Sequence, residues 1–243
     1  MIELRDVCWS TPEGRQILDH INLKIRDNRL TAISGPNGGG KTTLARILMG
    51  MDQPSSGKIL LDGQDITGLD VTERASRGIS FGFQQPVSFK GISVKRMLEL
   101  ASGHPVTRES LCAILQQVGL CAKDYIDRDI DSTLSGGEMK RIEIATVLAR
   151  NSQYVVLDEP EAGIDLWSFE KLISVFQNMK DSQNKTLVVI SHQERILQIA
   201  DEIVIIADGK VTDHGPGPEM LSKMLQNNRW ITHFCGEREV RYE

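Results

Sequence analysis

The sequence predicts an α/β fold: a mainly parallel sheet, an antiparallel β-subdomain at the N-terminus, and an α-helical subdomain inserted into the core. Two observations predict this fold. Short apolar strands alternate with helix-length amphipathic segments in the last third, which is typical of βαβ units. The middle third, about 90–150, holds helical patterns with few strand candidates between them.

The first third is predicted to consist mainly of strands. IELRDVCWS and ILDHINLKI alternate between apolar and polar residues on either side of a turn, and a short apolar strand follows them. A helix with a glycine at its end and a hairpin come next. These strands, the helix and the hairpin span 2–10, 17–25, 29–34, 43–50 and 57–66.

The rest of the chain is predicted to contain further helices and, in its last third, strands that alternate with them. Apolar residues at helical spacing predict helices in KRMLELA, TRESLCAILQQVGL, EMKRIEIATVLAR, LWSFEKLISVFQNMK and RILQIA. Apolar runs predict strands in YVVLDEP, TLVVISHQ and EIVIIADGKV. The tail from about residue 226 is too short to form a domain.

Composition excludes several classes of protein. The 243 residues carry a net charge of −5, which argues against a nucleic-acid-binding surface. The longest apolar runs are strand-sized, and the N-terminus lacks the layout of a signal peptide, so we expect a cytoplasmic protein. The four cysteines, at 8, 112, 121 and 235, have no CxxC spacing. We expect four reduced thiols, with Cys235 the most exposed.

A phosphate-binding loop is predicted between the third strand and the first helix. SGPNGGGKTT contains the P-loop pattern G-x-x-x-x-G-K-[ST], preceded by a strand and followed by a helix. Glycines allow successive backbone N–H groups to turn toward phosphate oxygens, and the helix N-terminus favours the same anion. We expect Lys41 to reach the β- and γ-phosphates of ATP and Thr42 to ligate Mg²⁺. The nucleotide-binding residues predicted here are Gly35, Pro36, Asn37, Gly38, Gly39, Gly40, Lys41, Thr42 and Thr43.

Two adjacent carboxylates follow the apolar strand YVVL. Asp158 is placed to hold Mg²⁺, and Glu159 is placed to orient or deprotonate the attacking water. Two carboxylates at a strand end could also form an ordinary solvated loop. A P-loop in the same chain makes the catalytic interpretation the better one.

The order of three motifs resembles the ABC-type ATPases. LSGGE (134–138) lies between the P-loop and LDEP, and the resemblance covers essentially the whole chain. It implies that Ser135, Gly136 and Gly137 begin a helix and bind the γ-phosphate held by a second copy of the chain. It also implies Mg²⁺-dependent ATP hydrolysis by a homodimer that forms on ATP binding.

The resemblance places three further residues. Gln84, in FGFQQP, is similar to the Q-loop glutamine that contacts Mg²⁺ and the attacking water. Asp165, in EAGID, occupies the D-loop at the dimer seam, although Glu161 and Ala162 depart from the usual pattern. His192, in VISHQ, resembles the switch histidine that contacts the γ-phosphate. Glu159, His192, Gln84 and Lys41 are therefore the expected catalytic set.

The same resemblance predicts one ABC ATPase domain over 1–243. Residues 1–84 and 152–225 are expected to form the nucleotide-binding core, 85–151 the helical subdomain, and 226–243 a C-terminal tail. The family often stacks adenine on an aromatic ring near CWSTPEG. Thr11 stands where that ring would be and Trp9 lies two residues earlier, so we expect weak purine contact.

Two partners are compatible with these motifs. FQQPVSFKGISV and GGEMKRIE resemble the SUF-type ATPases of iron–sulfur cluster assembly, which act on a soluble SufB/SufD-like scaffold protein. We favour this hypothesis, although Leu134 stands where that branch commonly has phenylalanine. The alternative is the nucleotide-binding subunit of a membrane transporter, whose permease is a separate chain. Neither hypothesis involves nucleic acid.

Overall fold

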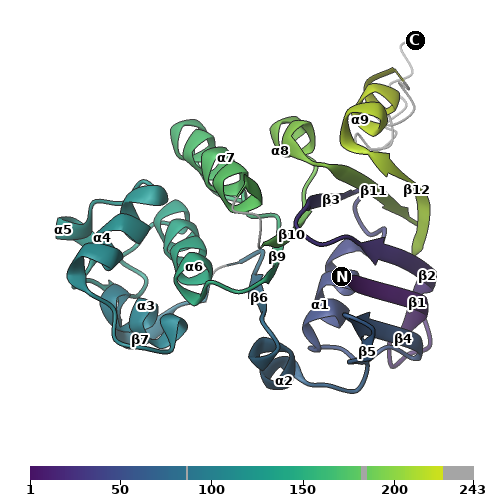
Figure 1. Ribbon diagram of the computed structural model, residues 1–243, viewed down its shortest axis with the longest axis horizontal. Helices are drawn as coiled ribbons and strands as arrows, with labels where there is room; N and C mark the ends of the chain where they lie inside the picture. Colours follow the sequence, from purple (N-terminus) through teal and green to yellow (C-terminus); the bar gives the residue numbers. More distant parts are fainter. Residues whose placement is uncertain (86, 182–184, 227–243) are drawn as a thin grey trace, which may run out of the picture.

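A six-stranded, mainly parallel sheet forms the centre of the computed structural model, which describes residues 1–85, 87–181 and 185–226 (Figure 1). Its order is β12-β11-β3-β10-β9-β6, and only β11 and β12 pair antiparallel. Every residue of β3, β9 and β10 is buried, as expected for parallel strands covered on both faces. The strands are β3 (Leu30–Ser34), β6 (Ile79–Gly82), β9 (Tyr154–Asp158), β10 (Thr186–Ile190), β11 (Glu202–Ala207) and β12 (Lys210–Pro216).

A second, antiparallel sheet lies beside the first, as predicted, and has the order β2-β1-β4-β5. It consists of β1 (Ile2–Ser10), β2 (Gln16–Ile25), β4 (Ser56–Leu61) and β5 (Gln64–Asp65). The predicted hairpin at 57–66 is the β4–β5 pair.

Alternate residues of the central strands enter two separate cores. Val155 and Leu157 of β9 pack in one core with the helical region, while Tyr154 and Val156 pack in the other with α1 and the antiparallel sheet. The period of two along a strand produces this division. The helices that accompany these sheets are α1 (Lys41–Met49), α2 (Val71–Ser76), α7 (Leu166–Asp181), α8 (Glu194–Ile199) and α9 (Gly217–Gln226).

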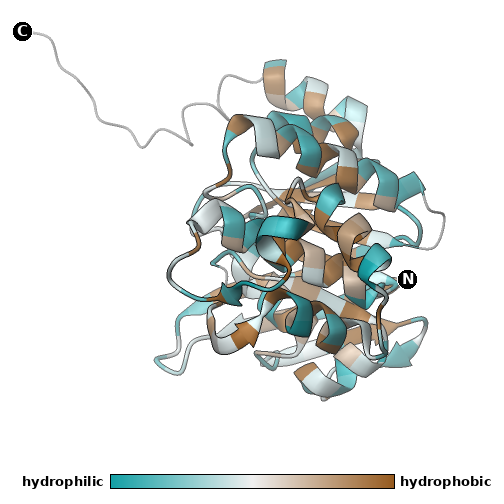
Figure 2. Ribbon diagram, turned by 90° about the vertical axis from the view of Figure 1, so that its left-hand side faces the viewer, coloured by the Kyte–Doolittle hydropathy of each residue, from teal (hydrophilic) through white to brown (hydrophobic). Residues whose placement is uncertain are grey.

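The inserted region at the left of Figure 1 is largely helical, as predicted. Figure 2 shows hydrophilic and hydrophobic residues alternating around its helices, which is how an amphipathic helix covers a core. The region contains α3 (Val94–Ser102), α4 (Arg108–Gln117), α5 (Ala122–Tyr125) and α6 (Gly136–Arg150). It also contains a small antiparallel pair that the sequence pattern did not predict, β7 (Phe89–Ser93) with β8 (Asp129–Ile130).

Three of the cysteines are free thiols: Cys8 is buried, Cys112 is partly buried and Cys121 is exposed. Cys235 and the predicted tail beyond residue 226 lie outside the described residues. Within the described ranges, no helix combines the length and apolar character needed to cross a bilayer.

Candidate functional site

The predicted phosphate loop connects the buried strand β3 to the N-terminus of α1. Gly38 has φ 78° and Gly40, the residue before the helix, has φ 105°, backbone conformations that glycine adopts without strain. A Cβ on Gly38 would meet no atom within 4 Å. The loop therefore leaves open space at Gly38, where an anion can approach the backbone.

Two other glycines are required by packing against the sheet. A Cβ on Gly35 would lie 2.1 Å from the carbonyl oxygen of Ile206 in β11, and one on Gly39 would lie 2.7 Å from the same atom. The sequence pattern explains the glycines by phosphate approach alone. The structure adds that the loop rests directly on the backbone of a neighbouring strand.

Lys41 closes the loop. Its Nζ donates to the carbonyl oxygens of Gly35 and Pro36, at 2.8 Å each, and the residue is 8% exposed. Burial lowers the pKa of Lys41, while the charges of Glu159 and Asp158 oppose that shift. The ammonium group thus lies at the loop centre, close to two carboxylates.

A cavity of about 510 Å³ opens in front of this loop. Its volume is within the range of small-molecule sites. It brings together eight of the predicted residues, Asn37, Gly38, Gly40, Lys41, Thr42, Thr43, Gln84 and Glu159. Four residues not included in the predicted site also line it, Trp9, Thr11, Arg15 and Ile17. Trp9 is partly buried: it lines the cavity and also packs against the core that α1 shares with the antiparallel sheet.

Asp158 lies behind the cavity at the end of β9 and is 1% exposed. Burial raises its pKa, and a hydrogen bond with the Thr42 side chain opposes this rise. Its Oδ1 has no hydrogen-bond partner in the described structure. A buried carboxylate oxygen without a partner, next to a threonine hydroxyl, is a donor set that suits Mg²⁺.

Glu159 and Gln84 form a direct pair across the cavity. The Gln84 amide Nε2 donates to Glu159 Oε2 at 2.7 Å. Glu159 has φ 45°, which is uncommon for a residue with a side chain and occurs often at functional sites. The sequence placed these two residues 75 positions apart, and the ends of β6 and β9 bring them together.

The LSGGE motif begins a helix, but not at this cavity. Ser135 is the N-cap of α6 and forms a capping box with Glu138, whose pKa is lowered to about 2, most strongly by the hydroxyl of Tyr125. Ser135 and Gly136 are exposed. A Cβ on Gly137 would lie 3.0 Å from the carbonyl oxygen of Gly163, so the motif adjoins the loop 161–165.

Asp165 has a structural role within this chain. Its carboxylate accepts from the backbone N–H groups of Trp167 and Ser168 at 3.1 and 3.0 Å, and from the Ser168 hydroxyl at 2.7 Å. It therefore satisfies free N–H groups at the start of α7.

His192 is exposed and does not line the cavity. Next to His192, the hydroxyl of Ser191 donates to the carboxylate of Glu161 at 2.5 Å, and burial raises the pKa of Glu161.

Two buried charged residues elsewhere in the molecule, Arg74 and Lys140, were not predicted from the sequence. Arginine and lysine are normally exposed, so sequence alone carries no signal for their burial.

Comparison with known proteins decides the family. The family model described as ABC transporter matches residues 18–162. An uncharacterised ABC transporter ATP-binding protein of Methanocaldococcus jannaschii is 39% identical over 85% of this chain and 86% of its own length. The chain belongs to the ABC transporter ATP-binding family.

Further members of this ABC family are similar over nearly the whole chain. A putative ABC transporter ATP-binding protein of Pyrococcus abyssi is 33% identical over 93% of this chain and 88% of its own length. A sulfate/thiosulfate import ATP-binding protein of Synechocystis is 32% identical over 92% of this chain but only 62% of its own length. None of these three names refers to iron–sulfur assembly.

Among solved structures, an ABC cassette in a dimeric post-hydrolysis state with ADP and Pi has a TM-score of 0.80 to this chain. It is 25% identical over 89% of this chain and 98% of its own length. The predicted α/β cassette fold is therefore confirmed.

Proposed function

We propose that this chain is the nucleotide-binding subunit of a membrane ABC transporter, which binds and hydrolyses ATP at the cytoplasmic face of the membrane. The supporting observation is the cavity that joins the phosphate loop to the Gln84–Glu159 pair, in a chain whose relatives are named as transporter ATP-binding proteins. This is the alternative that the sequence motifs left in second place. We now prefer it to the scaffold hypothesis because of those relatives.

In this proposal the phosphate loop holds the β- and γ-phosphates through backbone N–H groups, which the N-terminus of α1 reinforces. Lys41 exchanges the carbonyl oxygens of Gly35 and Pro36 for phosphate oxygens. Thr42, Gln84 and Asp158 hold Mg²⁺, and the unpaired Oδ1 of Asp158 is one reason that the site fits this ion. When bound, the ion neutralises charge that develops on the phosphates.

Glu159 is the proposed general base. Its carboxylate lies at the cavity and can accept a proton from the attacking water, while the Gln84 amide orients Glu159 and that water. His192 is the proposed γ-phosphate contact. Its exposed side chain requires a rearrangement to reach the cavity.

The second half of each site is proposed to come from another copy of the chain. Ser135, Gly136 and Gly137 do not line the cavity of their own chain, and two of them are exposed. Free N–H groups at the start of α6 suit an anion presented by a partner. The loop that contains Asp165 adjoins this motif through Gly163, and we propose that Asp165 lies at the same seam.

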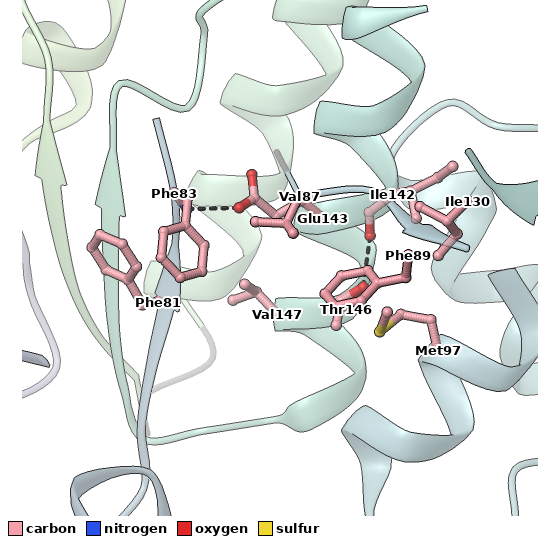
Figure 3. Close-up of a pocket in the computed structure, with 10 residues that line it drawn as sticks. All are labelled: Phe81, Phe83, Val87, Phe89, Met97, Ile130, Ile142, Glu143, Thr146 and Val147. Carbon is pink, nitrogen blue, oxygen red and sulfur yellow. Dashed lines mark hydrogen bonds between the residues drawn. The ribbon is translucent and has the colours of Figure 1, made fainter. Parts of the chain in front are cut away.

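An apolar cavity of about 160 Å³ is the proposed docking point for a loop of the permease (Figure 3). It lies between β6 and the helical region, and its lining is nearly all hydrophobic. Three of its side chains are unusually exposed for their type: Phe83 at 39%, Val87 at 49% and Phe89 at 41%. Exposed apolar residues that cluster at one cavity favour a protein partner.

Iron–sulfur cluster assembly remains the second candidate. FQQPVSFKGISV and GGEMKRIE favour it, and both segments border the same apolar cavity through Phe83 and Glu143. A soluble SufB/SufD-like scaffold would then occupy the place of the permease. The ATPase site is the same under either hypothesis.

Two measurements test the proposal. Glu159→Gln should abolish ATP hydrolysis and accumulate an ATP-loaded dimer in size-exclusion chromatography, because the amide fills the same space but cannot accept the proton. Hydrolysis at the parent rate would refute the assignment of the base.

Capture of the tagged chain from its host, with and without detergent and under anaerobic conditions, tests which kind of partner the chain binds. A polytopic membrane protein supports the transporter, whereas a soluble partner that carries iron and sulfide supports cluster assembly.

A further inference from the structure

Two charged residues of α6, one buried and one partly buried, lie at the junction between the helical region and the central sheet. Lys140 and Glu143 lie one turn apart, and their side chains are 1% and 14% exposed. Their charged groups are 3.0 Å apart. Buried charges of this kind are costly unless further hydrogen bonds satisfy them, so the remaining partners of the pair are informative.

Those partners are backbone groups of the segment that follows β6. Glu143 Oε1 accepts from the N–H of Phe83 at 2.6 Å, a bond drawn in Figure 3. Lys140 Nζ donates to the carbonyl oxygen of Phe83 and, at 3.4 Å, to that of Gln84. The pair therefore holds both the N–H and the C=O of Phe83, just after β6 has ended its pairing with β9.

The held segment leads directly to the nucleotide site. Gln84 is the residue after Phe83, and its side chain donates to Glu159 at 2.7 Å. A continuous series of contacts thus runs from α6 through the Phe83–Gln84 backbone to Glu159. Phe83 and Glu143 also line the apolar cavity, so a partner seated there would touch the same series.

We propose that Lys140 and Glu143 are positioning residues that hold the Phe83–Gln84 backbone so that the Gln84 amide stays on Glu159. The inference rests on the proposed function, in which Glu159 is the base. Neither residue lines the cavity at the phosphate loop, so the pair acts through Gln84.

A double-mutant cycle separates this role from simple structural support. Lys140→Met, Gln84→Ala and the double variant are compared for kcat and for KM of MgATP. Lys140→Met should lower kcat about tenfold, or about 1.4 kcal/mol, and change KM less than twofold. In the Gln84→Ala background the same substitution should lower kcat less than twofold, because the group it positions is gone. A tenfold loss in both backgrounds would overturn the inference.

Substitutions of Glu143 provide an independent test, which applies even if Lys140→Met does not fold. Glu143→Gln keeps an oxygen that can accept from Phe83 N–H and should retain more than half of the parent kcat. Glu143→Leu removes the acceptor and should lose about tenfold, again only when Gln84 is present. Equal losses in Glu143→Gln and Glu143→Leu would contradict the proposed contact. The matched control for Lys140→Met is Lys123→Met, at an exposed lysine of α5.

Hydrogen exchange distinguishes failure of this inference from failure of the proposed function. Glu143→Leu should accelerate exchange of the Phe83 amide whether or not the chain hydrolyses ATP, since the bond to that amide is lost. An unchanged exchange rate would refute the proposed hold of Glu143 on the Phe83 amide. If Glu159→Gln leaves hydrolysis intact while Glu143→Leu accelerates the exchange, the assignment of the base is wrong and the positioning contact is supported.

Discussion

Replacement of the buried Arg74 tests how the phosphate-binding helix is anchored. The guanidinium is fully buried and donates to four backbone carbonyl oxygens. Two belong to the last turn of α1, Ile47 at 2.5 Å and Leu48 at 3.0 Å. The others are Thr67 at 2.9 Å and Leu69 at 3.1 Å. Arg74 thus serves as the cap for the C-terminus of the helix that begins at Lys41.

The cost of Arg74→Met follows from these four acceptors. Ile47 O also accepts from Gly50 N–H, and Leu69 O accepts from the Gln53 amide at 3.5 Å. These two oxygens keep a second donor after the substitution, so the larger loss of hydrogen bonding falls on the carbonyl oxygens of Leu48 and Thr67. An unsatisfied buried polar group costs roughly 1–3 kcal/mol, and removal of a buried charge offsets part of this, so we expect a net loss of about 3 kcal/mol.

The assay is thermal and urea unfolding of the parent, of Arg74→Met and of a control, Arg77→Met. Arg77 is an exposed arginine at the end of α2, the helix that contains Arg74. For a chain of this size, 3 kcal/mol corresponds to a fall in Tm of about 9 °C. Burial lowers the pKa of Arg74 to about 10, so it stays protonated at neutral pH. A fall in Tm of under 2 °C, or one equal to that of the control, would refute this account.

Three further predictions concern the site. Lys41→Ala should raise the Kd for ATP more than tenfold, because a charge-assisted phosphate contact is lost, and a fluorescent ATP analogue measures it; unchanged affinity would contradict the role of Lys41. Ser135→Arg should abolish hydrolysis while ATP still binds the monomer, since bulk and charge enter the seam; an active variant would argue against a shared site. Glu138 has its pKa lowered to about 2, chiefly by Tyr125, so the carboxylate stabilises the fold above pH 4.5 and this contribution is lost as pH falls toward 2. The stability gap between the parent and Glu138→Gln, measured by urea unfolding, should shrink over that pH window; a constant gap would show that ionisation of Glu138 is not its source.

Local motifs carried most of the correct predictions. The strand and helix on either side of the P-loop pattern, the strand before Asp158 and the helix that begins in LSGGE each depend on neighbouring residues, so the chain itself specifies them. The predicted hairpin and the helix after the P-loop were correct for the same reason. The preference for a SUF-type partner rested on single letters around these motifs, and the named relatives support the transporter instead.

The sequence by itself determined the α/β order of elements and the residue types that can bind phosphate and metal, because these follow from periodicity and local backbone chemistry. Only the tertiary structure decided which distant groups meet. It brought Gln84 to Glu159, buried Arg74 and Lys140 against backbone carbonyls, and set Gly35 and Gly39 on β11. Such contacts depend on how sheets and helices pack, and the residue types alone do not record that packing.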